Sequence, residues 1–291
     1  MGARLFGFLL LLLWLPVHAG VRVVDDAGLE VVLDGPAQRI VSLAPHITEL
    51  LFAAGAGDRL VGVSEFSDYP QAARDVGRIG SGSGLDIEAI IALQPDLVVA
   101  WQSGNPAAGI RQLRMLGIPV FISEPRHLGD VPDTLLRLGQ LAGTGAEAAV
   151  QATAFTQRHA DLAAQYTGRA VVRVFYQVWD RPLMTVNGDH LISDVIRLCG
   201  GSNVFGSLSA LAPQIDIEAV LAADPDVIIV GSDDADSSVE LQAWRQWPVM
   251  QAVARRQLYT VRRELLVRHS PRILDGAEQL CAILEKVRGN K

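Results

Sequence analysis

A fifteen-residue segment that occurs twice is the feature that most constrains how this chain can fold. Asp86 to Ala100 reads DIEAIIALQPDLVVA, and Asp216 to Val230 reads DIEAVLAADPDVIIV, with identical residues at seven positions. In each copy an Asp that can cap a helix opens a short helical pattern, and Pro95 or Pro225 ends it. The apolar run that follows is too uniform for a half-exposed strand and is typical of a buried parallel strand. Each copy therefore predicts one helix–strand unit of an α/β fold.

A second pair of related segments supports this repeat. Residues 47–57 (ITELLFAAGAG) resemble residues 192–202 (ISDVIRLCGGS), and both are helical patterns that end in glycine. Two related halves in one chain predict two similar α/β lobes. Because a groove between lobes is a favoured place for a small molecule, we expect a ligand cleft between them.

A long Ala-rich segment lies between the two halves. Residues 144–166 form a helical pattern without Gly or Pro after Gly145, and a helix of that length spans about 33 Å. We therefore expect one rigid connecting helix, 144–167, between an N-terminal lobe, 21–143, and a C-terminal lobe, 168–291.

The first twenty residues have the pattern of a secretory signal. Arg4 precedes a nearly unbroken apolar run from Leu5 to Val17, and small residues follow at the positions where a signal peptidase cuts. The run is short for a membrane span. We predict that residues 1–20 are a signal peptide and that the mature protein is periplasmic.

Charge and cysteine content narrow the classes of partner. The chain has 32 acidic against 25 basic residues, a net charge of −7, so nucleic acid is not an expected partner. Its only cysteines are Cys199 and Cys281, and an even number in an exported chain favours a disulfide, although two unpaired buried thiols are the alternative.

Signatures of catalysis and of metal binding are missing from the sequence. We find no nucleophile elbow, phosphate loop, HExxH or CxxC motif, so neither an enzyme nor a bound metal or cofactor is expected. His46, which follows Pro45 where a helix should begin at the cleft, is a candidate axial ligand, with a structural role as the alternative.

The repeat also places two carboxylates in equivalent positions. Glu88 and Glu218 each lie in the first turn of the repeated helix, where the helix dipole stabilises negative charge. That local role is one interpretation. The other is that one acid on each lobe docks with basic pockets of a two-fold symmetric partner.

Several longer segments resemble a known family. RIVSLAPHITELLFAAG, VGVSEFSDYP, IEAIIALQPDLVVAW, WPVMQAVARRQLYTV and RHSPRI are similar to the helical-backbone class, class III, of periplasmic binding proteins, which serve ABC importers of corrinoids, haem and iron siderophores. The resemblance covers nearly the whole mature chain and is greatest to the corrinoid branch. It implies a monomeric receptor that delivers a corrinoid, vitamin B12 being the expected ligand, to an ABC permease dimer. Haem or a ferric siderophore is the alternative ligand.

The resemblance also implies roles for particular residues. Phe66, Trp101 and Trp179 would pack against the ring system of the ligand, and Glu264 and Arg268 would bond its periphery. The docking glutamates of the family fall on Glu88 and Glu218, and its disulfide falls on Cys199 and Cys281. Two further cleft tryptophans of the family align with Gly82 and Ala212, which removes apolar contact area.

Overall fold

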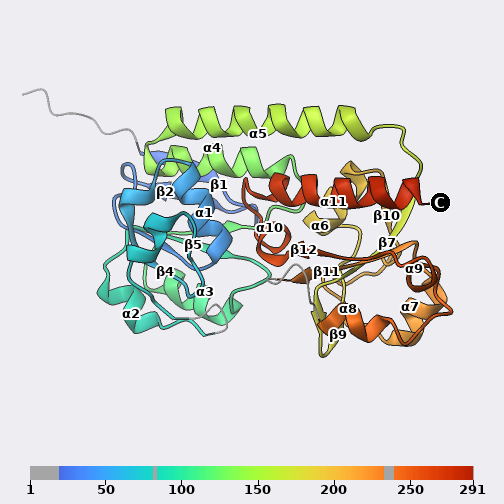
Figure 1. The fold of residues 1–291 in the computed structure, drawn as a ribbon. Coiled ribbons are helices and arrows are strands. Elements are labelled where there is room, and N and C mark those ends of the chain that lie inside the picture. The colour runs from blue at the N-terminus through green and yellow to red at the C-terminus, as the bar shows by residue number, and fades with distance from the viewer. Residues whose placement is uncertain (1–19, 81–83, 233–238, 291) are drawn as a thin grey trace, which may run out of the picture.

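The protein consists of two α/β lobes side by side, with one long helix crossing both of them (Figure 1). The computed structural model describes residues 20–80, 84–232 and 239–290. Residues 1–19 of the predicted signal peptide and Gly82 lie outside the described residues.

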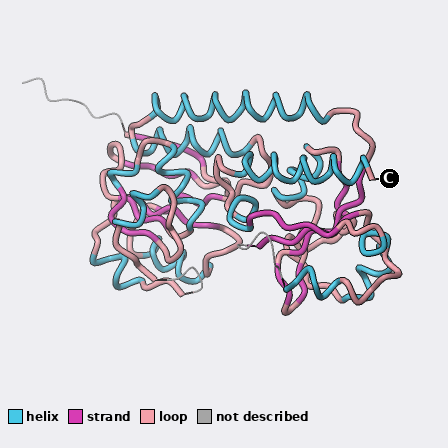
Figure 2. The backbone as a smooth tube through the Cα atoms, viewed as in Figure 1, coloured by secondary structure: helices cyan, strands magenta, loops and turns pink. Residues whose placement is uncertain are grey.

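The first lobe begins with an antiparallel hairpin and continues as a four-stranded parallel sheet. Its sheet has the strand order β4-β3-β5-β6. Strands and helices are both present in each lobe (Figure 2). The strands are β1 (Val21–Val24), β2 (Glu30–Leu33), β3 (Ile40–Ser42), β4 (Leu60–Val63), β5 (Leu97–Trp101) and β6 (Val120–Ser123). The helices are α1 (Pro45–Ala53), α2 (Ile87–Ala92), α3 (Ala107–Met115) and α4 (Asp130–Ala142), with 3₁₀ turns at Gly57–Arg59 and Gln71–Asp75.

The second lobe contains a parallel sheet of the same design, with the strand order β10-β7-β11-β12. The strands are β7 (Val172–Gln177), β8 (Trp179–Asp180), β9 (Leu183–Met184), β10 (Gly201–Asn203), β11 (Val227–Ser232) and β12 (Leu258–Arg262). The helices are α6 (Leu191–Leu198), α7 (Ile217–Ala223), α8 (Val239–Trp244), α9 (Gln251–Ala254), α10 (Arg263–Val267) and α11 (Ile273–Gly289). The prediction of two similar α/β lobes is confirmed.

The repeated segment forms the same local structure twice. Asp86 caps α2 by accepting a bond of 2.9 Å from the amide of Ala89, and Asp216 caps α7 through the amide of Ala219 at 2.7 Å. The last Asp of each copy then accepts a backbone amide of the neighbouring strand: Asp96 from Arg39, and Asp226 from Arg173.

Both sheets are buried on both faces, which explains the apolar runs. In β5, Leu97 and Val99 face a core that continues through both lobes, whereas Val98 and Ala100 face a second core inside the first lobe. Strand β11 alternates in the same way between the common core and a third one. Because successive side chains of these runs alternate between two covered faces, apolar residues are favoured at every position of Leu97–Ala100 and Val227–Val230.

Helix α5 (Gly145–Tyr166) joins the lobes and packs along both of them (Figure 1). At its start Ala148 lies against Gly139 of α4, where any larger residue would collide. Further along, Arg158 forms ion pairs of 2.7 Å with Asp275 and Glu278 of α11. The connector is therefore fixed to both lobes over its length rather than free between them.

Helix α11 is also held to α6 by a covalent bond. The Cys199–Cys281 disulfide joins the end of α6 to α11, with 4.7 Å between the two Cα atoms. The predicted pairing is confirmed, and the alternative of two free thiols is wrong.

Candidate ligand-binding seam between the lobes

A buried carboxylate from the first lobe is the centre of the contact between the lobes, which we call the seam. Glu49 lies on α1, and its side chain is only 2% exposed. It accepts hydrogen bonds from Arg268 at 2.9 Å, Arg272 at 3.1 Å and the hydroxyl of Ser270 at 2.5 Å, all from the second lobe. Three donors from one short segment compensate the loss of water around this charge.

The two arginines have further partners at the rim of the seam. Arg268 also donates to Asp68 at 2.7 Å and to the carbonyl oxygen of Phe66 at 3.1 Å. Although burial works against its charge, the bonds to Glu49 and Asp68 raise the pKa of Arg268. Arg272 donates to Glu264 at 3.0 Å, and its guanidinium lies 3.9 Å from the centre of the Tyr69 ring. Glu264 and Arg268 thus lie at the seam, with their charged groups bound by protein.

Phe66 is displayed on the outer side of this contact. Its side chain is 77% exposed, and its φ of 63° lies in the left-handed region, which is unusual for a bulky residue. Such conformations cost about 1–3 kcal/mol and gather at binding sites. The loop is fixed from below, because the Ser67 hydroxyl is buried and accepts a bond of 3.0 Å from Thr48 on α1.

Three histidines and a tryptophan form the floor of the seam. The His46 ring lies 5.0 Å from Trp101 and 5.6 Å from His269, and His190 lies 5.2 Å from His269. His46 and Trp101 come from the first lobe, whereas His190 and His269 come from the second. Trp101 is half-buried and packs so closely on Gly104 that a side chain there would strike the indole.

Burial keeps these imidazoles uncharged. It lowers the pKa of His269 to about 4, and burial together with His269 lowers that of His190 to about 3. The pKa of His46 falls well below its usual value, first through burial and then through the nearby His269 and Arg268. His46 is 3% exposed, and its Nε2 has no hydrogen-bond partner among the described residues. An axial role for His46 would require the seam to open.

On the second lobe, Trp179 lies at the carboxyl end of β7, on the hairpin of β8 and β9. Its side chain is exposed, and the guanidinium of Arg263 lies 5.4 Å from the centre of its ring. This hairpin, whose strands have only two residues each, was not predicted from the sequence. It has no counterpart after β3, which is followed almost at once by α1.

The proposed docking acids are exposed at equivalent points of the two lobes. Glu88 and Glu218 lie in the first turns of α2 and α7. In Figure 1 these two helices lie on the side of the molecule away from α5. Neither carboxylate forms an ion pair with the part of the chain that the structure describes.

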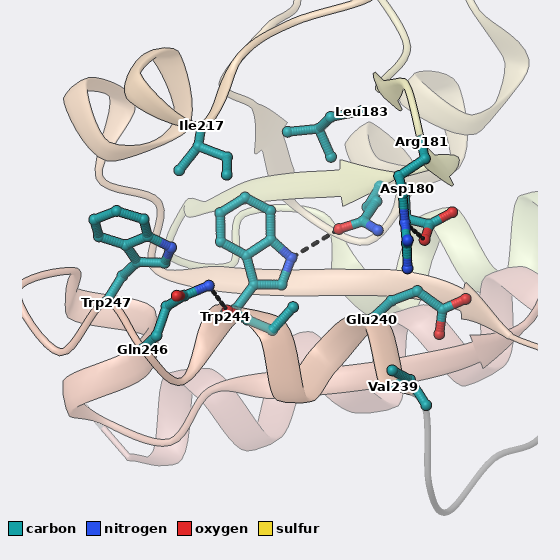
Figure 3. Close-up of a pocket in the computed structure, with 11 residues that line it drawn as sticks. Asp180, Arg181, Leu183, Ile217, Val239, Glu240, Trp244, Gln246 and Trp247 are labelled. Atoms are coloured by element: carbon teal, nitrogen blue, oxygen red, sulfur yellow. Dashed lines mark hydrogen bonds and ion pairs between the residues drawn. The ribbon is translucent and has the colours of Figure 1, made fainter.

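A pocket of about 280 Å³ lies in the second lobe beside the hairpin (Figure 3). Its inner end is apolar, and Trp244 there donates a hydrogen bond of 2.7 Å to Gln177. Asp180, Arg181 and Glu240 lie together at its other end. The lining also includes Leu183, Ile217, Val239, Ala243, Gln246 and Trp247.

The described residues also bear on whether the protein could hold a metal ion or cross a membrane. In the described ranges 20–80, 84–232 and 239–290, no group of three or more His, Cys, Asp or Glu could hold a metal ion. Within the same ranges no helix is both long and apolar enough to cross a membrane.

Comparison with known proteins supplies the family. The model of the periplasmic binding protein family matches residues 40–265, which include both parallel sheets and Glu49 and end just before the segment of Arg268, Ser270 and Arg272. The chain belongs to the periplasmic binding protein family. Among its relatives, the vitamin B12-binding protein of Vibrio cholerae is 39% identical over 251 residues, 86% of this chain and 90% of the relative. The vitamin B12-binding protein of Yersinia pestis is 38% identical over 245 residues, 84% and 85% of the two chains.

Solved structures of periplasmic binding proteins have the same two-lobed fold. The crystal structure of the periplasmic vitamin B12-binding protein BtuF of Vibrio cholerae matches with a TM-score of 0.80 and 37% identity, covering 87% of this chain and 98% of that one. The periplasmic haem-binding protein RhuT from Roseiflexus matches with a TM-score of 0.74 and 24% identity, covering 86% and 99%, a similarity of fold alone.

Glu49 and Ser270 are among the seam residues that sequence reasoning missed, together with Asp68, Tyr69, His190, His269 and Arg272. A signal was present for Glu49, since it is the one carboxylate in the predominantly apolar helix α1. A lone acid at such a position is rarely buried without a partner.

Proposed function

We propose that this periplasmic binding protein captures a corrinoid, most specifically vitamin B12, at the seam and delivers it to an ABC permease dimer. The observation that carries the proposal is the 39% identity to a vitamin B12-binding protein over 86% of the chain, which includes both lobes. The exposed ring of Phe66, held in a strained backbone conformation beside the seam, supports a flat ligand.

In this proposal Phe66, Trp101 and Trp179 contact the ring system. Glu264 and Arg268 contact its periphery from their places at the rim, where Glu264 keeps 34% of its side chain exposed. No covalent step is involved. We further propose that the protein acts as a monomer in the periplasm after residues 1–20 have been removed. Its parts would then be an N-terminal lobe of 21–143, a connecting helix of 144–167 and a C-terminal lobe of 168–291.

The test is calorimetric titration of the purified mature protein with cyanocobalamin and, separately, with haemin. We expect one cobalamin to bind per chain, and we expect Phe66→Ala to weaken that binding because it removes an exposed aromatic ring. Haemin binding without cobalamin binding would overturn the proposal in favour of a haem receptor.

Glu88 and Glu218 are proposed to bind basic pockets on the two halves of the permease. Their exposure, their equivalent positions in the repeat and their lack of ion pairs with described residues support this role. The two acids should therefore be needed for transport and dispensable for ligand binding.

A further inference from the structure

Arg263 lies where the second lobe faces the seam. It is the first residue of α10 and follows β12 directly, at the carboxyl end of the parallel sheet. Five residues later the same segment delivers Arg268 to Asp68 and Phe66 of the first lobe. Ligands of α/β proteins bind beyond the carboxyl ends of the strands, so this position borders the ligand site.

Among the residues that the structure describes, the charge of Arg263 is poorly compensated. The one carboxylate within 4 Å in that part of the chain is Glu240, at 3.9 Å, and the guanidinium donates no hydrogen bond to a described residue. Its Nε is buried, while 25% of the whole side chain is exposed. Arg268 and Arg272 differ sharply, since carboxylates lie within 2.7–3.1 Å of both. Arg268 and Arg272 each use part of their five N–H donors on described residues, whereas Arg263 keeps all of its donors for a ligand.

A second unpartnered donor lies next to Arg263. The Tyr176 side chain is fully buried, and its hydroxyl has no hydrogen-bond partner within the described part of the chain. Both side chains lie next to Gly231, because a Cβ on that glycine would be 2.8 Å from the Tyr176 hydroxyl and 3.5 Å from Cγ of Arg263. Burial raises the pKa of Tyr176, so the hydroxyl stays protonated and can donate. Buried polar groups without partners are rare in native proteins and call for an explanation, and a molecule bound beside Arg263 would supply an acceptor for this hydroxyl.

We propose that Arg263 binds an anionic oxygen group on the periphery of the ligand, with Tyr176 as a second donor behind it and Trp179 holding the guanidinium in place. The inference rests on the proposed function and deepens it. A complete corrinoid carries one such group, the phosphodiester of its nucleotide loop. Arginine suits a phosphate oxygen because its planar group offers several donors together with a charge. Trp179 stabilises the guanidinium through its ring face and leaves the donors free.

The test compares two corrinoids in calorimetric titration. Cobalamin contains the phosphodiester, whereas cobinamide keeps the corrin ring and lacks the nucleotide loop. We expect Arg263→Gln to weaken cobalamin binding about 10- to 100-fold, the range of a hydrogen bond to a charged group. Cobinamide binding should stay within about twofold. Arg263→Lys keeps the charge and loses the planar guanidinium, so it should lose an intermediate amount of affinity for cobalamin and none for cobinamide.

Two further variants separate binding from folding. Arg255→Gln removes an exposed arginine of the same lobe that forms no ion pair with a described residue, and should leave both affinities unchanged. Tyr176→Phe deletes a hydroxyl that has no partner among the described residues, so this variant should fold normally. It should bind cobalamin a few-fold more weakly.

The outcomes are distinguishable. If the unaltered protein binds both corrinoids and Arg263→Gln weakens both equally, or neither, the subsite is overturned while the proposed function stands. If the unaltered protein binds neither corrinoid, the proposed function fails and the subsite with it. The subsite is supported if Arg263→Gln loses more affinity for cobalamin than for cobinamide, and if this loss of affinity becomes smaller at high salt.

Discussion

Replacing Glu49 by glutamine should strongly destabilise the protein. The carboxylate is 2% exposed, and it accepts hydrogen bonds from Arg268, Arg272 and Ser270. Glutamine has nearly the same shape, but it is neutral and offers one acceptor oxygen in place of two. Two arginines, with side chains only 12% and 15% exposed, would then lose the anion between them.

The expected magnitude follows from the cost of breaking a buried ion pair. Removing one partner of such a pair costs about 3–5 kcal/mol, because the other charge stays buried without compensation. Arg268 keeps Asp68 and Arg272 keeps Glu264, so the lower end of that range applies. We expect a loss of about 3 kcal/mol, which lowers the thermal midpoint of a chain of this size by about 6–12 °C.

Thermal and urea denaturation followed by circular dichroism give the measurement. The matched control is Glu30→Gln, which removes an exposed pair with Arg22 at 3.5 Å and should change stability by less than about 1 kcal/mol. Combining Glu49→Gln with Arg272→Met should cost less than the sum of the single changes, since both changes remove the same interaction between Glu49 and Arg272. If Glu49→Gln behaves like the exposed control, the two lobes are not joined through this carboxylate.

Three further outcomes are expected. Because the folded pKa values of His46, His190 and His269 lie below the unfolded value of about 6.5, the unfolded chain binds more protons in acid. The free energy of unfolding should be highest above about pH 6.5 and should fall as the pH is lowered towards about 4, by up to about 1.4 kcal/mol per pH unit for each histidine. Urea denaturation at several pH values checks this, and a free energy of unfolding that does not change with pH contradicts it. Changing Cys199 and Cys281 to serine opens a loop with a sequence separation of 82 and should cost about 4–5 kcal/mol by the chain-entropy model. Equal urea midpoints for this variant and the unaltered protein would count against that figure. The double variant Glu88→Ala, Glu218→Ala should keep its ligand affinity in calorimetry and lose transport in an uptake assay, whereas normal uptake would defeat the docking role.

Much of the fold could be predicted because the two lobes repeat one pattern. The strand that ends each repeated segment and the long helix that starts near Gly145 lie within a residue or two of their predicted positions. Apolar runs between Pro and Gly leave little choice of structure when both faces of a sheet are covered.

The β8–β9 hairpin and helix α10 could not be predicted in the same way. Both are short, with two-residue strands at Trp179–Asp180 and Leu183–Met184 and a five-residue helix at Arg263–Val267. Periodicity needs longer windows than these to separate a strand or helix from a loop. Their structure is decided by tertiary contacts, such as the bond from the amide of Ile215 to the carbonyl oxygen of Leu183.

The directions of the charged side chains could not be predicted from the sequence, because they depend on contacts between distant segments. Four arginines between residues 262 and 272 look alike in a linear reading. In the structure Arg268 and Arg272 reach Glu49, more than 200 residues away, whereas Arg263 remains beside Trp179. Only the packing of the second lobe against α1 distinguishes the two sets, because a pair so distant in sequence leaves no local pattern.

The seam also bears on how the protein binds its ligand. The lobes contact each other directly: Glu49 has three donors from the second lobe, and α5 is fixed to α4 at one end and to α11 by Arg158. Opening the lobes would expose or separate these charges, at a cost comparable to that of breaking a buried pair. A site preorganised in this way spends little binding free energy on closure. We therefore expect affinity to depend on the side chains that face the ligand, such as Phe66 and Trp179, rather than on movement of the lobes.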